Sequence, residues 1–251
     1  YEMVDGLVGS EMCIRDRLVT MASNLGYRAL AITDECSLAG VVKAHVATFN
    51  RNIKLIIGSE FKIDSHKVIV LVTNRNSYSK LSSLITLARR RSKKGSYQIK
   101  WSDLKFNNDD LLIIWLPCGD FKKDQLIISQ LHDWFERRLW IGFHNFLNGT
   151  ETSHLSYLQK LSLLWKVNVV ACGDVHMHKK DRQPLQDVLT AIKQKCSIME
   201  LGKSRYPNSE RYLRKIEYLK NIYPEELMRE TINISNLCNF SLNELRYEYP
   251  I

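Results

Sequence analysis

Short apolar runs alternate with longer amphipathic stretches from residue 18 to the end of the chain. This alternation is typical of βα units that build a mainly parallel sheet. The apolar runs predict strands over 29–33, 54–59, 67–72, 111–116, 139–143 and 167–171. The amphipathic stretches predict helices over 18–24, 37–50, 77–91, 123–136, 152–165, 182–195 and 225–237. We expect Ser37 and Ser77 to be N-caps, and Gly26 to end the first helix.

The chain has 251 residues, of which 45% are hydrophobic and 25% charged, as in a globular protein with a core to bury. At this length, one large α/β domain or two small domains fit. The longest uninterrupted apolar run, 111–116, is far below the roughly 18 residues of a membrane span. Thirty-six Lys and Arg against 27 Asp and Glu give a net charge of +9. This excess suits either a protein near polyanions or a merely solvated basic surface.

The cysteines indicate the redox setting of the protein, and the tryptophans and isolated histidines can be assigned to core or surface. The six cysteines are scattered without a CxxC pair, which argues against a zinc knuckle or a disulfide framework and favours a reducing, cytoplasmic setting. The tryptophans beside apolar runs are expected in the core: Trp101, Trp115, Trp134, Trp140 and Trp165. Four histidines away from strand ends are expected at the surface: His45, His66, His132 and His154.

Nearly every predicted strand is followed by a residue that can bind a metal or move a proton. These residues are Asp34 and Glu35, Glu60, Cys118, His144, and Asp174 with His176 and His178. In a parallel α/β barrel the C-terminal strand ends open on one face, so these residues would share one polar pocket. Imidazole with carboxylate suits Zn, Mn or Fe. The alternative is that loops after strands are simply polar.

Residues 1–17 do not read as the start of a domain. They show weak periodicity and no cap, and they resemble a translated sequencing-adapter tail. We therefore expect 1–17 to be a non-native segment and 18–251 to be the domain.

Several long strings occur together and in order: LGYRALAITDECSLAGVVKAH, KLIIGSEF, LITLARRRSKKGSY, GDVHMH with LQDVLTAI, PNSERYLR and FSLNELRYEYP. Together they resemble the N-terminal PHP (polymerase and histidinol phosphatase) domain of bacterial error-prone DNA polymerases, which are relatives of the polymerase III alpha subunit. The resemblance runs from about residue 18 to the end of the chain.

The resemblance implies a distorted seven-stranded (β/α) barrel, here lacking its first strand, with metal ions held at the strand ends. Matched by motif, it places metal ligands at Asp34, Glu60, His144, Asp174 and His176, for Zn, Mn or Mg. The first strand of the family supplies an HxH pair, and this sequence has the 1–17 segment in its place. Glu35 replaces the usual His after Asp34, and no equivalent of the His after the third strand is evident. One metal could be held, whereas a complete cluster is not expected.

For function, the resemblance implies DNA-directed DNA synthesis in the intact protein, with lesion bypass and damage-induced repair in the bacterial cytoplasm. The palm carboxylates of that reaction would lie beyond this chain, which is expected to be an N-terminal fragment that does not polymerise alone. Two roles for the fragment remain open: a scaffold that stabilises the polymerase and helps bind DNA, or a metal-dependent phosphoesterase or 3′–5′ exonuclease-type hydrolase.

The implied partners are DNA, the rest of the polymerase chain and other repair or replication proteins, without a membrane. Two basic groups could meet phosphates: the stretch 88–94, and Lys179, Lys180 and Arg182. A charge run at a helix end is also often only a solvated cap.

Overall fold

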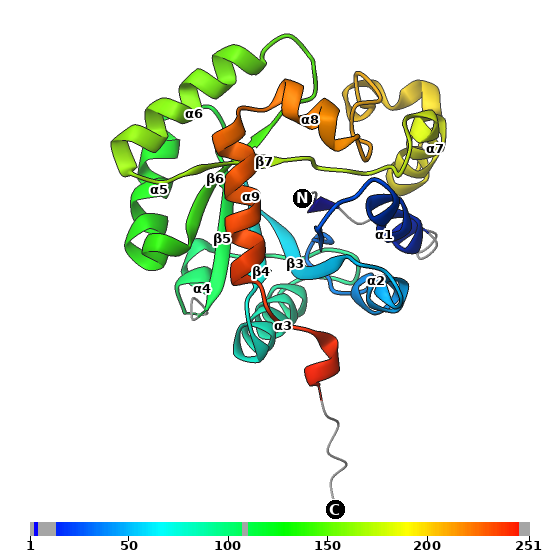
Figure 1. Cartoon of the computed structure of the whole chain (residues 1–251). Helices are drawn as coiled ribbons and strands as arrows, with labels where there is room; N and C mark the ends of the chain where they lie inside the picture. The colour runs from blue at the N-terminus through cyan, green and yellow to red at the C-terminus, as the bar shows by residue number, and fades with distance from the viewer. Residues whose placement is uncertain (1–2, 5–13, 107–109, 246–251) are drawn as a thin grey trace, which may run out of the picture.

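A single curled sheet forms the centre of the molecule (Figure 1). The computed structural model describes residues 3–4, 14–106 and 110–245. Within them the strands follow chain order across the sheet. They are β1 (Met3–Val4), β2 (Ala29–Ile32), β3 (Lys54–Ile63), β4 (His66–Val72), β5 (Leu111–Leu116), β6 (Leu139–His144) and β7 (Val169–Cys172).

The predicted strands are all present, and the sheet is mainly parallel as expected. The exception is β4, which runs antiparallel to both β3 and β5. It forms a hairpin with β3 around Asp64, whose φ of 54° lies in the left-handed region that Asp tolerates. At the position expected for the missing first strand, the two-residue β1 pairs in parallel with β2. The fold is therefore the α/β barrel-like sheet that the sequence predicts, with a minimal first strand.

Helices pack around the sheet, and most lie within a few residues of their predicted positions. They are α1 (Ile14–Asn24), α2 (Val41–Thr48), α3 (Arg75–Arg90), α4 (Trp101–Phe106), α5 (Phe121–Phe135), α6 (Glu151–Trp165), α7 (Gln183–Gln194), α8 (Ile216–Ile222) and α9 (Glu225–Leu237). Two of them, α4 and α8, are not predicted, because a helix of one or two turns is too short to show a recognisable hydrophobic repeat. The first helix begins at Ile14 rather than at residue 18.

The two predicted N-caps are wrong, whereas the predicted helix stop is confirmed. Helix α2 begins at Val41 with Gly40 as its cap, well after Ser37. In α3 the cap is Asn74, and Ser77 is the third helical residue of a reciprocal capping box. Gly26, with φ of +77°, closes the turn after α1, as a glycine in the left-handed region can do without strain.

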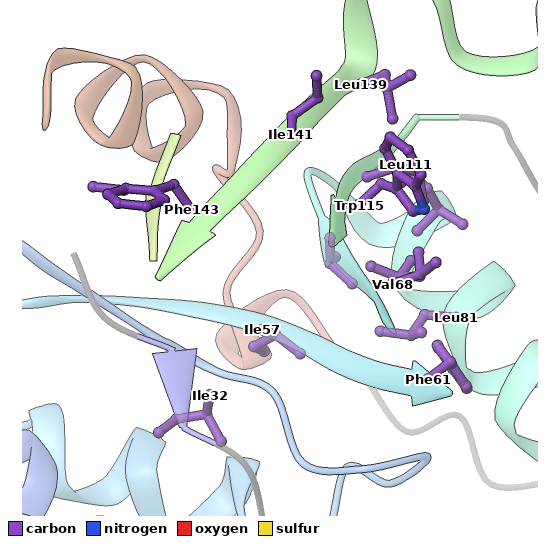
Figure 2. Packing of buried hydrophobic residues seen from close by; sticks show 14 of the residues in the cluster. Ile32, Ile57, Phe61, Val68, Leu81, Leu111, Trp115, Leu139, Ile141 and Phe143 are labelled. Atoms are coloured by element: carbon purple, nitrogen blue, oxygen red, sulfur yellow. The ribbon is translucent and has the colours of Figure 1, made fainter. Parts of the chain in front are cut away.

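Alternate residues of the strands point to opposite faces of the sheet and form two apolar layers. The outward side chains pack under the surrounding helices, and Figure 2 shows part of this layer, with Ile32, Phe61 and Trp115 among its members. The inward side chains form a smaller cluster that also contains Ile234 of α9 and Cys238, the residue just after that helix. Because α9 lies against this inner side, the barrel interior is a packed core with its polar groups at the C-terminal strand ends.

The tryptophan prediction is consistent with these layers. Trp115 and Trp140 are buried. The remaining three, Trp101, Trp134 and Trp165, are partly buried and pack against the outer layer.

Candidate functional site

The five predicted metal ligands, which we call the rim site, lie at or just after the ends of β2, β6 and β7 and in the second half of β3: Asp34, Glu60, His144, Asp174 and His176. Four of the five side chains are buried, and His144 is half-buried. A backbone bridge brings the loop after β2 onto β3, where the Cys36 N–H donates to the Glu60 carbonyl at 2.8 Å. The carboxylates are thus held in place by the sheet.

Lys67 joins two carboxylates that are far apart in the sequence. Its ammonium lies 3.1 Å from Glu60 Oε1 and 4.0 Å from Asp174 Oδ2. Lys67 is the first inward-facing position of β4, because its strand neighbours Ile69 and Leu71 belong to the inner cluster. Glu60 and Asp174 therefore open onto the same side of the sheet, and an internal cation lies between them.

A second internal cation pairs with Asp174. The Arg211 guanidinium forms an ion pair with the Asp174 carboxylate. The same guanidinium stacks against two rings, 3.9 Å from the Phe146 centroid and 4.3 Å from the Tyr206 centroid. Contacts with two aromatic rings restrict the position of the guanidinium. Arg211 is positioned there because its carbonyl accepts the N–H of His176, which aligns the two segments.

His176 contacts its own neighbour within the rim site. Its Nε2 lies 3.2 Å from Asp174 Oδ1 and 3.2 Å from the Tyr206 hydroxyl. Asp174 itself has φ of 47°, so the chain turns there before the histidine. Burial lowers the pKa of His178, and the charges of Arg182, Arg17 and Lys179 lower it further.

Asp34 also has an arginine partner. Arg15 Nη2 and Nε donate to Asp34 Oδ1 at 2.7 and 3.1 Å, and the Gly40 N–H donates to Oδ2 at 3.0 Å. A Cβ at position 40 would lie 1.8 Å from Arg15 Nε, so only glycine leaves room for this arrangement. Arg15 belongs to the segment 1–17, whose non-native origin stays a prediction.

His144 is held in its neutral form. Burial lowers the pKa of His144 well below its ordinary value, and the positive charges of Arg211 and Lys67 lower it further. A neutral imidazole is the form that binds a metal, although here the same cations would repel one.

The rim site as it stands does not fit a divalent metal ion. Its carboxylates Asp34, Glu60 and Asp174 each have an Arg or Lys partner within the described residues. A metal would have to displace the Lys67 ammonium and overcome the repulsion of Arg211, because both lie where its charge would be needed. Neither cation was predicted from the sequence. A lysine at an inward-facing position beside a buried glutamate is the signal that could have revealed Lys67.

A different group has the composition of a metal site. One ligand atom each from His66, Cys118 and Asp124 lie within 4.8 Å of one another, so these residues could hold a metal ion. The prediction that His66 is a surface histidine is wrong, because only 4% of it is exposed. Its ring stacks on Trp115 and meets Trp101 edge-on, so it fills a gap between sheet and helices.

The basic stretch 88–94 is only partly available to a ligand. Arg89 donates to the carbonyls of Glu35 and Cys36, and Arg91 pairs with Asp103. Arg90, Lys93 and Lys94 are exposed. Beside them, a surface hollow of about 730 Å³ runs along α3, and four hydroxyl side chains line it with Leu87, Arg90 and Arg91. These four are Ser79, Ser82, Ser83 and Thr86.

Helices long and apolar enough to cross a bilayer are absent from the residues that the structure describes.

The chain is similar in sequence to known proteins of one family. The model of the PHP domain family matches residues 10–138. Error-prone DNA polymerases of Saccharophagus degradans and Methylococcus capsulatus are 46% and 47% identical, over 93% of this chain in both cases. The chain spans about a quarter of their length, 23% and 22%.

A solved structure from Bifidobacterium adolescentis, provisionally assigned as a metal-dependent phosphoesterase, gives a TM-score of 0.46 at 14% identity. The match covers 69% of this chain and 85% of that protein.

Proposed function

This chain belongs to the PHP domain family, and from that premise we propose that it is the N-terminal domain of an error-prone DNA polymerase of the bacterial cytoplasm. The support is the 46–47% identity to two such polymerases over 93% of this chain. In the intact protein the reaction would be DNA-directed DNA synthesis across damaged template, carried out by residues outside this chain.

Within that polymerase, we propose that the domain is a non-catalytic scaffold. The observation that carries this proposal is the Lys67 ammonium between Glu60 and Asp174. A hydrolase of this kind would use a metal-bound hydroxide, and its metal needs carboxylates that are free to coordinate. Here Arg211 and Lys67 already neutralise them, so the rim site ties β3, β4 and the loop after β7 together.

The alternative role, a metal-dependent phosphoesterase, is tested by hydrolysis. The purified chain is incubated with bis(p-nitrophenyl) phosphate and added Mn²⁺ or Zn²⁺, beside an Asp174→Asn variant. We expect the two proteins to give the same background rate. Metal-dependent hydrolysis that disappears in Asp174→Asn would establish the enzymatic role and refute the scaffold.

We also propose that the domain helps to bind DNA through α3. The hydroxyl side chains and Arg90 lie along one side of this helix, with Lys93 and Lys94 just beyond its end. Arginine, lysine, serine and threonine are the side chains that most often contact nucleic-acid phosphates. The net charge of +9 also favours binding to a polyanion such as DNA.

The polymerase assignment has its own test. Primer extension by the full-length protein that carries this domain, on a template with an abasic site, should give products past the lesion. Loss of extension on undamaged and damaged templates alike, in a folded full-length protein, would contradict the proposal.

A further inference from the structure

All but one of the buried carboxylates in the described part of the chain are paired with an arginine or a lysine. These pairs are Asp34 with Arg15, Glu60 with Lys67, Asp103 with Arg91, Asp174 with Arg211, Asp187 with Arg205, and Glu210 with Lys180. Asp124, fully buried, has only His66 as an ion-pair partner in that part of the chain.

The Asp124 carboxylate is nevertheless held in one orientation. Oδ1 accepts from the Cys118 N–H at 3.0 Å and lies 2.9 Å from His66 Nε2. Oδ2 accepts from the Gly119 N–H at 2.9 Å and from the Tyr157 hydroxyl at 2.6 Å. Hydrogen bonds reduce the cost of a buried charge without supplying an opposite one.

We propose that His66, Cys118 and Asp124 bind a zinc ion. A neutral imidazole, a thiolate and a carboxylate balance the charge of Zn²⁺, so the ion would place a cation beside Asp124, which has no arginine or lysine partner in the described part of the chain. Zinc prefers this mixture of nitrogen, sulfur and oxygen donors at about 2.0–2.3 Å in a tetrahedron. Such ligand atoms lie about 3.3–3.8 Å apart. The three ligand atoms lie within 4.8 Å of one another, and zinc binding would replace the 2.9 Å contact between His66 Nε2 and Asp124 Oδ1.

The site is separate from the rim site. His66 begins β4 and stacks on Trp115, a residue of the outer apolar layer, whereas Lys67 faces the inner side with Glu60. Cys118 follows β5, and Asp124 lies in the first turn of α5. A zinc ion here would fasten the start of β4 to the β5–α5 turn, with the fourth position left for water. The inference does not depend on the proposed polymerase function.

Metal binding to the full chain tests the proposal directly. Apo-protein is titrated with Zn²⁺ against a chromophoric chelator, and separately with Co²⁺, whose thiolate charge-transfer and tetrahedral d–d absorption report a sulfur ligand. The variants are Cys118→Ser and His66→Gln, with Cys196→Ser as the matched control, since Cys196 is a half-buried thiol beyond α7. Circular dichroism establishes that each variant is folded.

We expect one Zn²⁺ per chain, and affinity more than about 100-fold weaker in Cys118→Ser and His66→Gln, because losing a ligand costs more than losing a residue that orients one. The cobalt charge-transfer band should be present in Cys196→Ser and absent in Cys118→Ser. Absence of zinc binding by the native chain, or equal affinity in folded Cys118→Ser, would overturn the proposal. So would binding that survives Cys118→Ser and is lost in Asp174→Asn, which would place the metal at the rim site.

Discussion

Lys67 supplies the cation that Glu60 and Asp174 of the rim site share. Replacing it by methionine keeps most of the aliphatic stem but removes the ammonium, so buried Glu60 loses that charge. Because Lys67 is about one-third exposed, we expect a loss of about 1–3 kcal/mol in the free energy of unfolding, below the cost of breaking a fully buried pair. Urea denaturation measures it.

The matched control is Lys62→Met. Lys62 pairs with Glu35 at 2.9 Å but has an exposed side chain, and exposed ion pairs contribute at most about 1 kcal/mol. Equal losses in the two variants would show that Lys67 acts only as another surface cation.

Cysteine reactivity should follow burial. Burial raises the pKa of Cys36 to about 11 and those of Cys172 and Cys238 to about 12. At pH 8 a thiol with a pKa of about 12 is thiolate in about one molecule in ten thousand, and only the thiolate is alkylated. We expect iodoacetamide to modify half-buried Cys196 before buried Cys36, Cys172 and Cys238, and the slow rate at Cys172 to rise about tenfold per pH unit. Peptide mass spectrometry measures each site.

Early modification of Cys172 or Cys238 in the native chain at pH 8 would contradict this order. Cys118 adds a further comparison, because bound zinc should protect its thiol while leaving Cys196 unchanged.

The sequence could identify most rim residues but not their partners. Asp34, Glu60, Asp174 and His176 each follow an apolar run closely, and that position is visible in the sequence. Arg211 is remote from every predicted strand. It reaches Asp174 only because the loop around it aligns with His176, an arrangement that hydrophobic periodicity does not encode.

At the scale of elements, two glycines set how closely neighbouring strands approach inside the barrel. A Cβ at Gly58 of β3 would lie 2.6 Å from the Val70 carbonyl oxygen. At Gly142 of β6 it would lie 2.7 Å from Leu116 Cδ2, a side-chain methyl that can move. We expect Gly58→Ala to cost about 2–3 kcal/mol and Gly142→Ala about 1–2 kcal/mol, measured by thermal unfolding. A larger loss in Gly142→Ala would mean that the inner apolar cluster cannot adjust.

The elements predicted well are those with long or strongly apolar patterns. The run 111–116 coincides with β5, and 225–237 coincides with α9. The direction of β4 could not be read from its apolar residues, because alternation is the same in parallel and antiparallel strands. The capping of α3 depends on which of two hydroxyl or amide side chains, Asn74 or Ser77, reaches a backbone N–H, and spacing alone leaves that choice open.

At the scale of the whole molecule, some basic side chains pair with buried carboxylates and others are exposed. Three of the 36 cationic side chains, Arg15, Lys67 and Arg211, neutralise buried carboxylates of the rim site. Each such pair contributes no net charge, so the excess of +9 lies among the cations that are not paired in this way. Composition predicts the charge of a binding partner, and the structure shows which cationic residues are exposed and could contact it. Those at the end of α3 are exposed and adjoin the hydroxyl-lined hollow.

This distribution predicts where single-stranded DNA contacts the domain. Replacing Arg90, Lys93 and Lys94 together by alanine should weaken binding of an oligonucleotide and flatten the dependence of log Kd on log salt. Each lost phosphate contact removes about 0.7 from the slope. The control removes the same charge elsewhere, from exposed Arg137, Lys160 and Lys166 in or near α5 and α6, across the molecule from α3 in Figure 1. If both triple variants lose affinity and slope equally, the chain attracts DNA by net charge alone, and α3 is not its contact surface.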